Sequence, residues 1–138
     1  MVQIDIEYQG SLRCEAVHGP SGTRLLTDAP VDNMGKGESF SPTDLVATAL
    51  ASCIVTTMAI FADRHDWDLT GTRATVEKHM VADPRRIGEL TVVVRVPHEF
   101  DEKTRATLEK VGMTCPVHRT IGPDTNMPVR FEWGAAVS

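Results

Sequence analysis

Two of the three cysteines in this 138-residue chain, together with one of its histidines, are placed where they could do covalent chemistry. Cys53 lies inside an uncharged run at residues 45–62, and Cys115 opens the segment CPVH at residues 115–118. If Pro116 is the first residue of a helix, Cys115 caps that helix, and free backbone amides favour its thiolate. His118 would follow on the same helical face and could add positive charge when protonated. A fold that brought the two cysteines together would hold a thiol redox couple.

Cys53 is not activated by its own sequence neighbours. It stands well beyond the first turn of a helix that we expect to begin at Pro42, so the helix amides do little for its thiolate. Apolar surroundings disfavour a thiolate, so Cys53 would react only if a cation, best an arginine, came from elsewhere. Taken singly, Cys53 and Cys115 are each also consistent with plain packing. Cys14 shares a strand face with Leu12 and Ala16 and is assigned to packing.

Two other chemistries would use the same residues. Cys115 and His118 have the spacing of half a zinc site, with Cys53 as a third ligand, but the sequence offers no second close pair. A Cys–His nucleophile for acyl transfer would need an orienting acid or an oxyanion motif, and neither is identifiable. We therefore expect no metal and no resident cofactor.

The composition of the chain argues against two classes of binding partner. A net charge of −5, without a Lys/Arg cluster, argues against nucleic acid. Residues 45–62 reach the lower edge of membrane-span length, but their Ala, Thr and Ser content and the flanking Asp44 and Asp63 favour a buried helix. The N-terminus has no signal-peptide pattern, and three cysteines in such a chain indicate a reducing cytoplasm. We expect neither a nucleic-acid nor a membrane partner.

The remaining pattern predicts an α+β fold in a single domain, residues 1–138. Strands are expected at residues 2–9, 12–16, 23–27, 67–81, 90–96 and 129–133, and helices at 42–62, 101–112 and 115–121. Ser41 is the expected cap of the long helix, and Asp44 places a carboxylate in its first turn. Residues 28–40 read as a long loop without structure, and such loops are often functional. Because the long helix is apolar nearly all round, one small domain cannot cover it, and we infer a partner subunit.

Three motifs in order resemble the OsmC/Ohr family of thiol peroxidases: FSPTDL at residues 40–45, ALASC at 49–53 and CPVHRTI at 115–121. The resemblance implies an OsmC-like fold, in which a long buried central helix is wrapped by antiparallel sheets within an intertwined homodimer. It also implies that Cys53 attacks organic hydroperoxides, that Cys115 resolves the product, and that the protein protects against oxidative stress. The implied reductant is an external dithiol such as a lipoyl group.

One position departs from the family pattern. Typical members carry a glutamate, in an Asn-Pro-Glu motif, which holds the arginine that activates the attacking thiol. Here that position is Thr43, and Asp44 is adjacent but on another helical face.

The arginine could be Arg13 or Arg24, with Lys36 a weaker candidate, and His118, Thr43 and Asp44 complete the candidate supporting residues. The match is closer to a divergent OsmC-like branch. The alternative function is therefore a module without peroxidase activity that binds a small hydrophobic or thiol ligand at the dimer interface.

Overall fold

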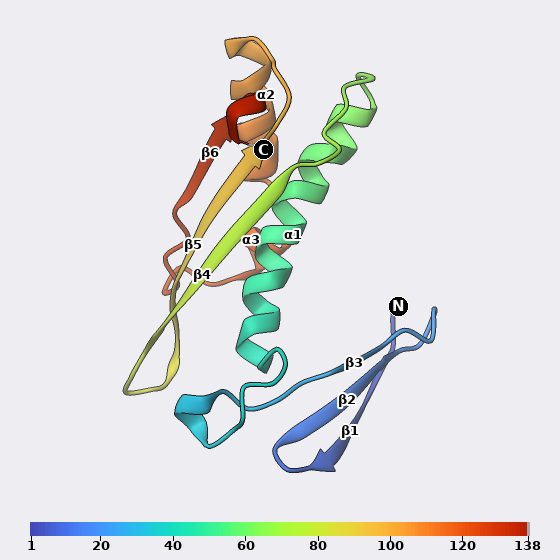
Figure 1. Ribbon diagram of the computed structural model, residues 1–138, viewed down its shortest axis with the longest axis vertical. Helices are drawn as coiled ribbons and strands as arrows, with labels where there is room; N and C mark the ends of the chain where they lie inside the picture. Colours follow the sequence, from blue (N-terminus) through green and yellow to red (C-terminus); the bar gives the residue numbers. More distant parts are fainter. Residues whose placement is uncertain (138) are drawn as a thin grey trace. The chain divides into compact units, whose positions relative to one another are not determined.

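The computed structural model describes residues 1–137 and divides into two compact units. The first unit is Met1–Val46, and the second begins at Ala47. Each contains a three-stranded sheet. A long helix at residues 42–63 follows the first sheet in the sequence, and two shorter helices come between the last two strands of the second sheet, as Figure 1 shows. The predicted α+β class is confirmed. The assignment of the whole chain to one domain stays a prediction.

The first unit is built on an antiparallel sheet. Its strands, in order, are β1 (Ile4–Gly10), β2 (Arg13–His18) and β3 (Arg24–Leu26). Apolar and polar side chains alternate along β1, which is the pattern of a strand with two different faces. The predicted turn is present, and Gly10, Ser11 and Leu12 all have positive φ. The second strand therefore begins at Arg13, one residue later than predicted.

Residues 28–40 form a tightly folded loop. It contains one turn of 3-10 helix, η1 (Val31–Asn33), where the sequence predicted no structure. The loop closes on itself, because the Asp28 N–H donates to the Phe40 carbonyl oxygen at 3.0 Å. A Cβ on Gly35 would stand 1.7 Å from the Ala29 carbonyl oxygen, so only glycine fits there.

Helix α1 (Pro42–Asp63) begins where the sequence predicted. The Ser41 hydroxyl oxygen accepts the Asp44 N–H at 3.1 Å, and the Asp44 carboxylate accepts the Ser41 N–H at 2.8 Å. Each residue thus satisfies a backbone donor that the helix leaves free, which is a capping box with aspartate as the acid. Pro42 follows at the first helical position, where its missing N–H costs nothing.

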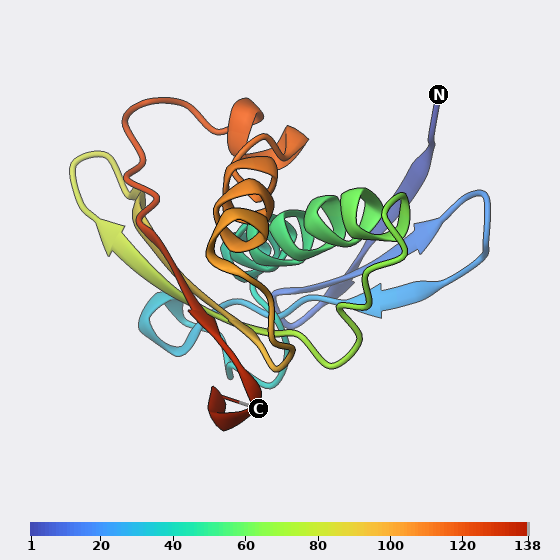
Figure 2. The ribbon, with the colours of Figure 1, turned by 90° about the horizontal axis from the view of Figure 1, so that it is seen from above.

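The second unit packs helices on one face of a mixed sheet (Figure 2). Its elements are β4 (Arg73–Val81), β5 (Arg86–Val96), α2 (Glu102–Gly112), α3 (Pro116–Thr120), β6 (Val129–Trp133) and η2 (Ala135–Val137). β4 pairs antiparallel with β5, as expected, whereas β6 runs parallel to β5. The difference from an antiparallel sheet arises because α2 and α3 form the crossover connection that a parallel pair requires.

The core of the second unit joins α1 to β5. One face of α1 is buried, and alternate residues of β5 point at it, as the predicted apolar face requires. The fully buried aliphatic side chains are Leu50, Ile54 and Met58 from α1, Leu90, Val92, Val94 and Val96 from β5, and Leu108 from α2. Gly112 allows α2 to pack closely against α1, since a Cβ at this position would stand 2.9 Å from Cγ of Met58.

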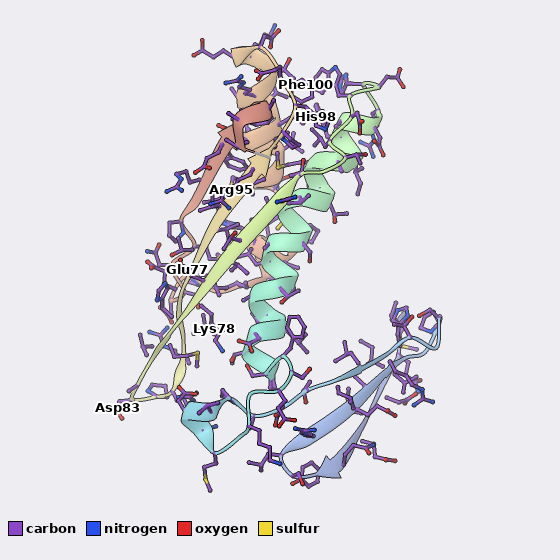
Figure 3. All side chains as sticks on the ribbon, viewed as in Figure 1. Glu77, Lys78, Asp83, Arg95, His98 and Phe100 are labelled. Carbon is purple, nitrogen blue, oxygen red and sulfur yellow. The ribbon has the colours of Figure 1, made fainter. Side chains whose placement is uncertain are left out.

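The segment before β4 differs from its prediction. Residues 67–81 were expected to be one strand, but the strand begins only at Arg73. Trp67 instead packs between the rings of Phe61 and Phe100, with centroids 6.2 and 6.1 Å away. The His98 ring nitrogen Nε2 donates to the Thr70 carbonyl at 2.6 Å. Figure 3 places Phe100 and His98 together beyond the end of β5, where this tertiary packing overrides strand propensity.

Only part of α1 is covered within the chain. Its buried residues lie on one face, while Ile60 is 52% exposed. Among the described residues, α1 is the one helix long and apolar enough to cross a membrane by length and composition, a test that core helices of soluble proteins also pass. The predicted coverage on most sides is not reached by a single chain.

The capping box can be tested by Ser41→Ala. Loss of the hydroxyl acceptor frees the Asp44 amide, so the free energy of unfolding should fall by about 1 kcal/mol in urea denaturation. Ser52→Ala is the matched control, because the exposed Ser52 hydroxyl bonds only carbonyls within α1. That control should leave stability unchanged or slightly higher, since alanine favours a helix interior. Equal losses in both variants would contradict the capping role.

Candidate active site

Cys53 lies in the middle of α1 and is half-buried. Leu50, one turn before it, and Ile54, the next residue, belong to the core, so Cys53 sits at the edge of the buried face. Its Sγ lies 4.0 Å from the Thr57 hydroxyl oxygen, one turn further along the helix. The thiol is therefore held by a rigid element yet is not sealed from solvent.

Cys115 is placed by the junction of α2 and α3. α2 ends at Gly112, and α3 begins at Pro116, which leaves Cys115 as the cap of α3. Its Sγ accepts the His118 N–H at 3.2 Å, which confirms the predicted capping arrangement. The side chain is completely buried, with no exposed area.

The fold brings these two cysteines together. Both belong to the second unit, and Cys53 lies near enough to Cys115 for its side chain to raise the pKa of the Cys115 thiol. Both are free thiols. A helix interior and a helix cap, far apart in sequence, thus form a pair of adjacent sulfur atoms.

Burial raises the pKa of the Cys115 thiol above its ordinary value, and the neighbouring Cys53 side chain raises it further. The His118 backbone amide acts in the opposite direction but is outweighed. The sequence suggested Cys115 as the more acidic thiol because it caps a helix. That expectation is wrong, because the pKa of Cys115 is raised and not lowered. The packing that brings the amide to the sulfur also excludes water, and the loss of water disfavours the thiolate.

His118 contributes to the pair through its backbone. Its amide bonds the Cys115 sulfur, and its side chain is half-buried on α3. Within residues 1–137, no three His, Cys, Asp or Glu side chains are grouped so that they could hold a metal ion.

The other candidate residues belong to the first unit. Asp44 and Thr43 lie at the start of α1, where the Thr43 hydroxyl is 3.1 Å from the Ser41 hydroxyl. Lys36 lies in the loop at residues 28–40, and Arg24 pairs with Glu15 across neighbouring strands.

Arg13 is bound by two carboxylates that sequence reasoning did not select. Its guanidinium bonds the Glu38 carboxylate and lies 3.4 Å from Oδ2 of Asp28. The hydrogen bond to Glu38 is the main cause that raises the pKa of Arg13, so the guanidinium stays charged. Both acids belong to the loop predicted as functional, but no sequence signal points from them to Arg13.

The family relationship rests on a direct match. Residues 35–130, which include both cysteines, match the family described as OsmC-like protein. The chain belongs to the OsmC-like family. Two of its structural neighbours are named as organic hydroperoxide resistance proteins. No curated protein matches the chain.

Solved structures agree with this OsmC-like assignment. A Psychrobacter arcticus protein, described as osmotic stress induced and of the detoxification response, is 46% identical, with a TM-score of 0.91 over 95% of this chain and 96% of that one. An organic hydroperoxide resistance protein OsmC from Legionella pneumophila is 16% identical, with a TM-score of 0.73 over 96% of both chains. OhrB of Bacillus subtilis is 13% identical, with a TM-score of 0.67 over 96% of this chain and 98% of that one. The predicted OsmC-like fold is confirmed.

The raised pKa of Cys115 predicts how stability depends on pH. The folded protein holds the Cys115 proton more tightly than the unfolded chain does, so this contribution is complete below about pH 8.5 and is lost as the pH rises. The free energy of unfolding should therefore fall from about pH 7 to about pH 9.5 in reduced wild type, and fall less in Cys115→Ala. Urea denaturation with excess reductant measures both. An equal decline in the two proteins would contradict the assignment.

Proposed function

We propose that this OsmC-like protein is an enzyme, a cysteine peroxidase that reduces organic hydroperoxides through a Cys53–Cys115 disulfide cycle. The observation that carries the proposal is that two free thiols, Cys53 and Cys115, are neighbours in the second unit. The hydroperoxide resistance named for two structural neighbours supports the substrate class. We further propose that the enzyme works in the cytoplasm, where a reducing environment returns the disulfide to thiols.

The environments of the two thiols support a division of roles. A peroxide molecule can approach Cys53, which is half-buried, whereas Cys115 has no exposed area. The raised pKa of Cys115 keeps it protonated in the resting protein, and a protonated thiol is a poor nucleophile. Cys53 is therefore the proposed attacking residue and Cys115 the resolving residue.

The cycle balances in three steps. The Cys53 thiolate attacks the distal peroxide oxygen, the O–O bond breaks, and the alkoxide leaves as an alcohol after taking a proton. The Cys53 sulfenic acid then condenses with the Cys115 thiol, which forms the disulfide and releases water. A dithiol such as a lipoyl group finally reduces the disulfide by exchange and becomes a cyclic disulfide itself. Sulfur is oxidised by the peroxide and reduced by the dithiol, and no further cofactor takes part.

Arg13 is the proposed cation for the Cys53 thiolate. Arginine stays charged at any physiological pH, and two carboxylates fix this side chain, one of them completely buried. Arg24 is a weaker candidate because its one carboxylate partner is solvent-accessible and its own side chain is 63% exposed. An exposed ion pair of this kind holds a side chain poorly.

A homodimer is the second part of the proposal. The first sheet has an apolar face, on which Ile4 and Ile6 of β1 are 55% and 63% exposed, around a hollow of about 390 Å³. We propose that a second copy of the chain buries this apolar surface and the uncovered part of α1. The same hollow is the observation that favours the alternative function, binding of a small hydrophobic ligand.

The redox cycle can be tested on reduced protein with one equivalent of cumene hydroperoxide. Intact mass should fall by about 2 Da in wild type, as the disulfide forms, whereas Cys115→Ser should gain one oxygen as the sulfenic acid. Cys53→Ser should keep its mass, and Cys14→Ser is the matched control that should behave as wild type. A wild-type mass that does not change would reject the cycle. Ligand binding retained by Cys53→Ser in that case would establish the alternative.

The dimer can be tested by sedimentation equilibrium at micromolar concentration. The expected mass is twice the 15.1 kDa of one chain. Ile6→Glu should shift the protein toward monomer because it places a charge on the apolar face of β1. Gln3→Glu, on the other face of the same alternating segment, should leave the mass unchanged. A wild type that sediments as a 15.1 kDa monomer would contradict the proposal.

A further inference from the structure

We propose that the hydroxyl of Thr57 donates a hydrogen bond to the Cys53 thiolate and so supports the attack on the peroxide. This inference rests on the proposed function, because it assigns a partner to the sulfur that attacks. Both residues belong to the second unit and to one rigid element, α1. The contact therefore depends only on the geometry of a single helix.

Helix geometry brings the Thr57 hydroxyl to the sulfur. Residues four positions apart in an α-helix lie one above the other on the same face. Thr57 follows Cys53 by four residues, and its hydroxyl oxygen lies 4.0 Å from Sγ of Cys53. This distance is long because a neutral thiol is a weak acceptor, and hydrogen bonds to a charged group are shorter. The contact should therefore tighten when Cys53 loses its proton.

The orientation of the Thr57 hydroxyl differs from that of other hydroxyls in the helices. Ser52, Thr107 and Thr120 each donate to the carbonyl oxygen four residues earlier, at 2.7, 2.9 and 2.7 Å. Among the described residues, the partner of the Thr57 hydroxyl is instead the sulfur of Cys53. A threonine in a helix has two accessible χ1 rotamers, and its hydroxyl has one proton to donate. Thr57 thus keeps that proton available for the sulfur.

The surroundings of Cys53 and Thr57 increase the effect of this hydrogen bond. Both side chains are half-buried, and the next residue after each of them, Ile54 and Met58, is fully buried. A hydrogen bond is electrostatically stronger where water is partly excluded. The apolar neighbours by themselves disfavour a thiolate, so a hydroxyl donor offsets part of their effect.

Thr57 acts on the charge of the sulfur and does not act as an acid. The Cys53 proton passes to water when the thiolate forms, and the hydroxyl keeps its own proton throughout. The sequence indicated no activating group among the neighbours of Cys53, because a hydroxyl in a helix commonly bonds the backbone. Only the orientation of this side chain in the structure identifies it as a donor to the sulfur.

The test measures how fast Cys53 is alkylated by iodoacetamide as the pH is varied. The full chain is used in a Cys14→Ser, Cys115→Ala background, which leaves one thiol and removes the neighbouring sulfur. Thr57→Val removes the hydroxyl and keeps the β-branched shape. It should move the midpoint of the profile upward by about half to one pH unit and slow alkylation at about pH 7 by roughly three- to tenfold. The rate at high pH, where the thiol is fully ionised, should not fall.

Two further variants serve as controls. Thr57→Ser keeps the hydroxyl and should keep the midpoint of the parent protein. Thr56→Val makes the same substitution at the neighbouring exposed residue and should also leave the midpoint unchanged. A purely structural loss would lower the fraction of protein that reacts, without moving the midpoint. If Thr57→Val does not fold in a thermal scan, Thr57→Ala decides, since alanine favours a helix and also lacks the hydroxyl.

The inference is overturned if the variants without the Thr57 hydroxyl keep the midpoint of the parent protein, or if Thr57→Ser or Thr56→Val shifts it as far. Failure of the proposed function looks different. In that case wild type forms no disulfide with cumene hydroperoxide, whatever the alkylation profile of Cys53. The two measurements therefore separate the role of Thr57 from the activity itself.

Discussion

The close approach of α2 to α1 at Gly112 is the contact on which the thiol pair depends. A side chain at this position would collide with Met58 and approach Ile54, both of which are fully buried on α1. Because α2 can end directly against α1, the chain turns there and places Cys115 three residues later beside Cys53. The pair is thus a product of core packing, and the core residues on α1 and β5 hold it as firmly as they hold each other.

That packing also decides the electrostatics of the pair. A hydrogen bond to a charged group contributes about 1.5–3 kcal/mol, whereas removal of an ion from water costs several kcal/mol. The single amide that His118 offers to Cys115 therefore cannot compensate for complete burial, and the pKa of Cys115 rises. A resolving thiol gains from this arrangement, since it stays protonated and unreactive until a sulfenic acid forms next to it.

The sequence could predict those features that depend only on residues close together in the chain. The capping box of Ser41 and Asp44, the alternation along β1 and β5, and the Cys115 cap each require only a few neighbouring residues, and the structure contains all of them. Motif resemblance, not pattern, paired the cysteines. What could not be predicted depends on tertiary contacts: the parallel pairing of β6, the raised pKa of Cys115, and the loop carboxylates on Arg13.

The proposed peroxidase cycle and the proposed homodimer both involve one face of α1. Ile60 follows Cys53 by two helical turns, so both lie on the same side of the helix, and Ile60 is half-exposed. A second copy that covered Ile60 would therefore lie along the same side of α1 as Cys53. A second copy that packed on this apolar surface would exclude water and lower the local dielectric constant. The attraction between the Cys53 thiolate and a cation beside it would then be stronger. Dimer formation and the reactivity of Cys53 are thus physically linked, because both depend on the same surface of α1.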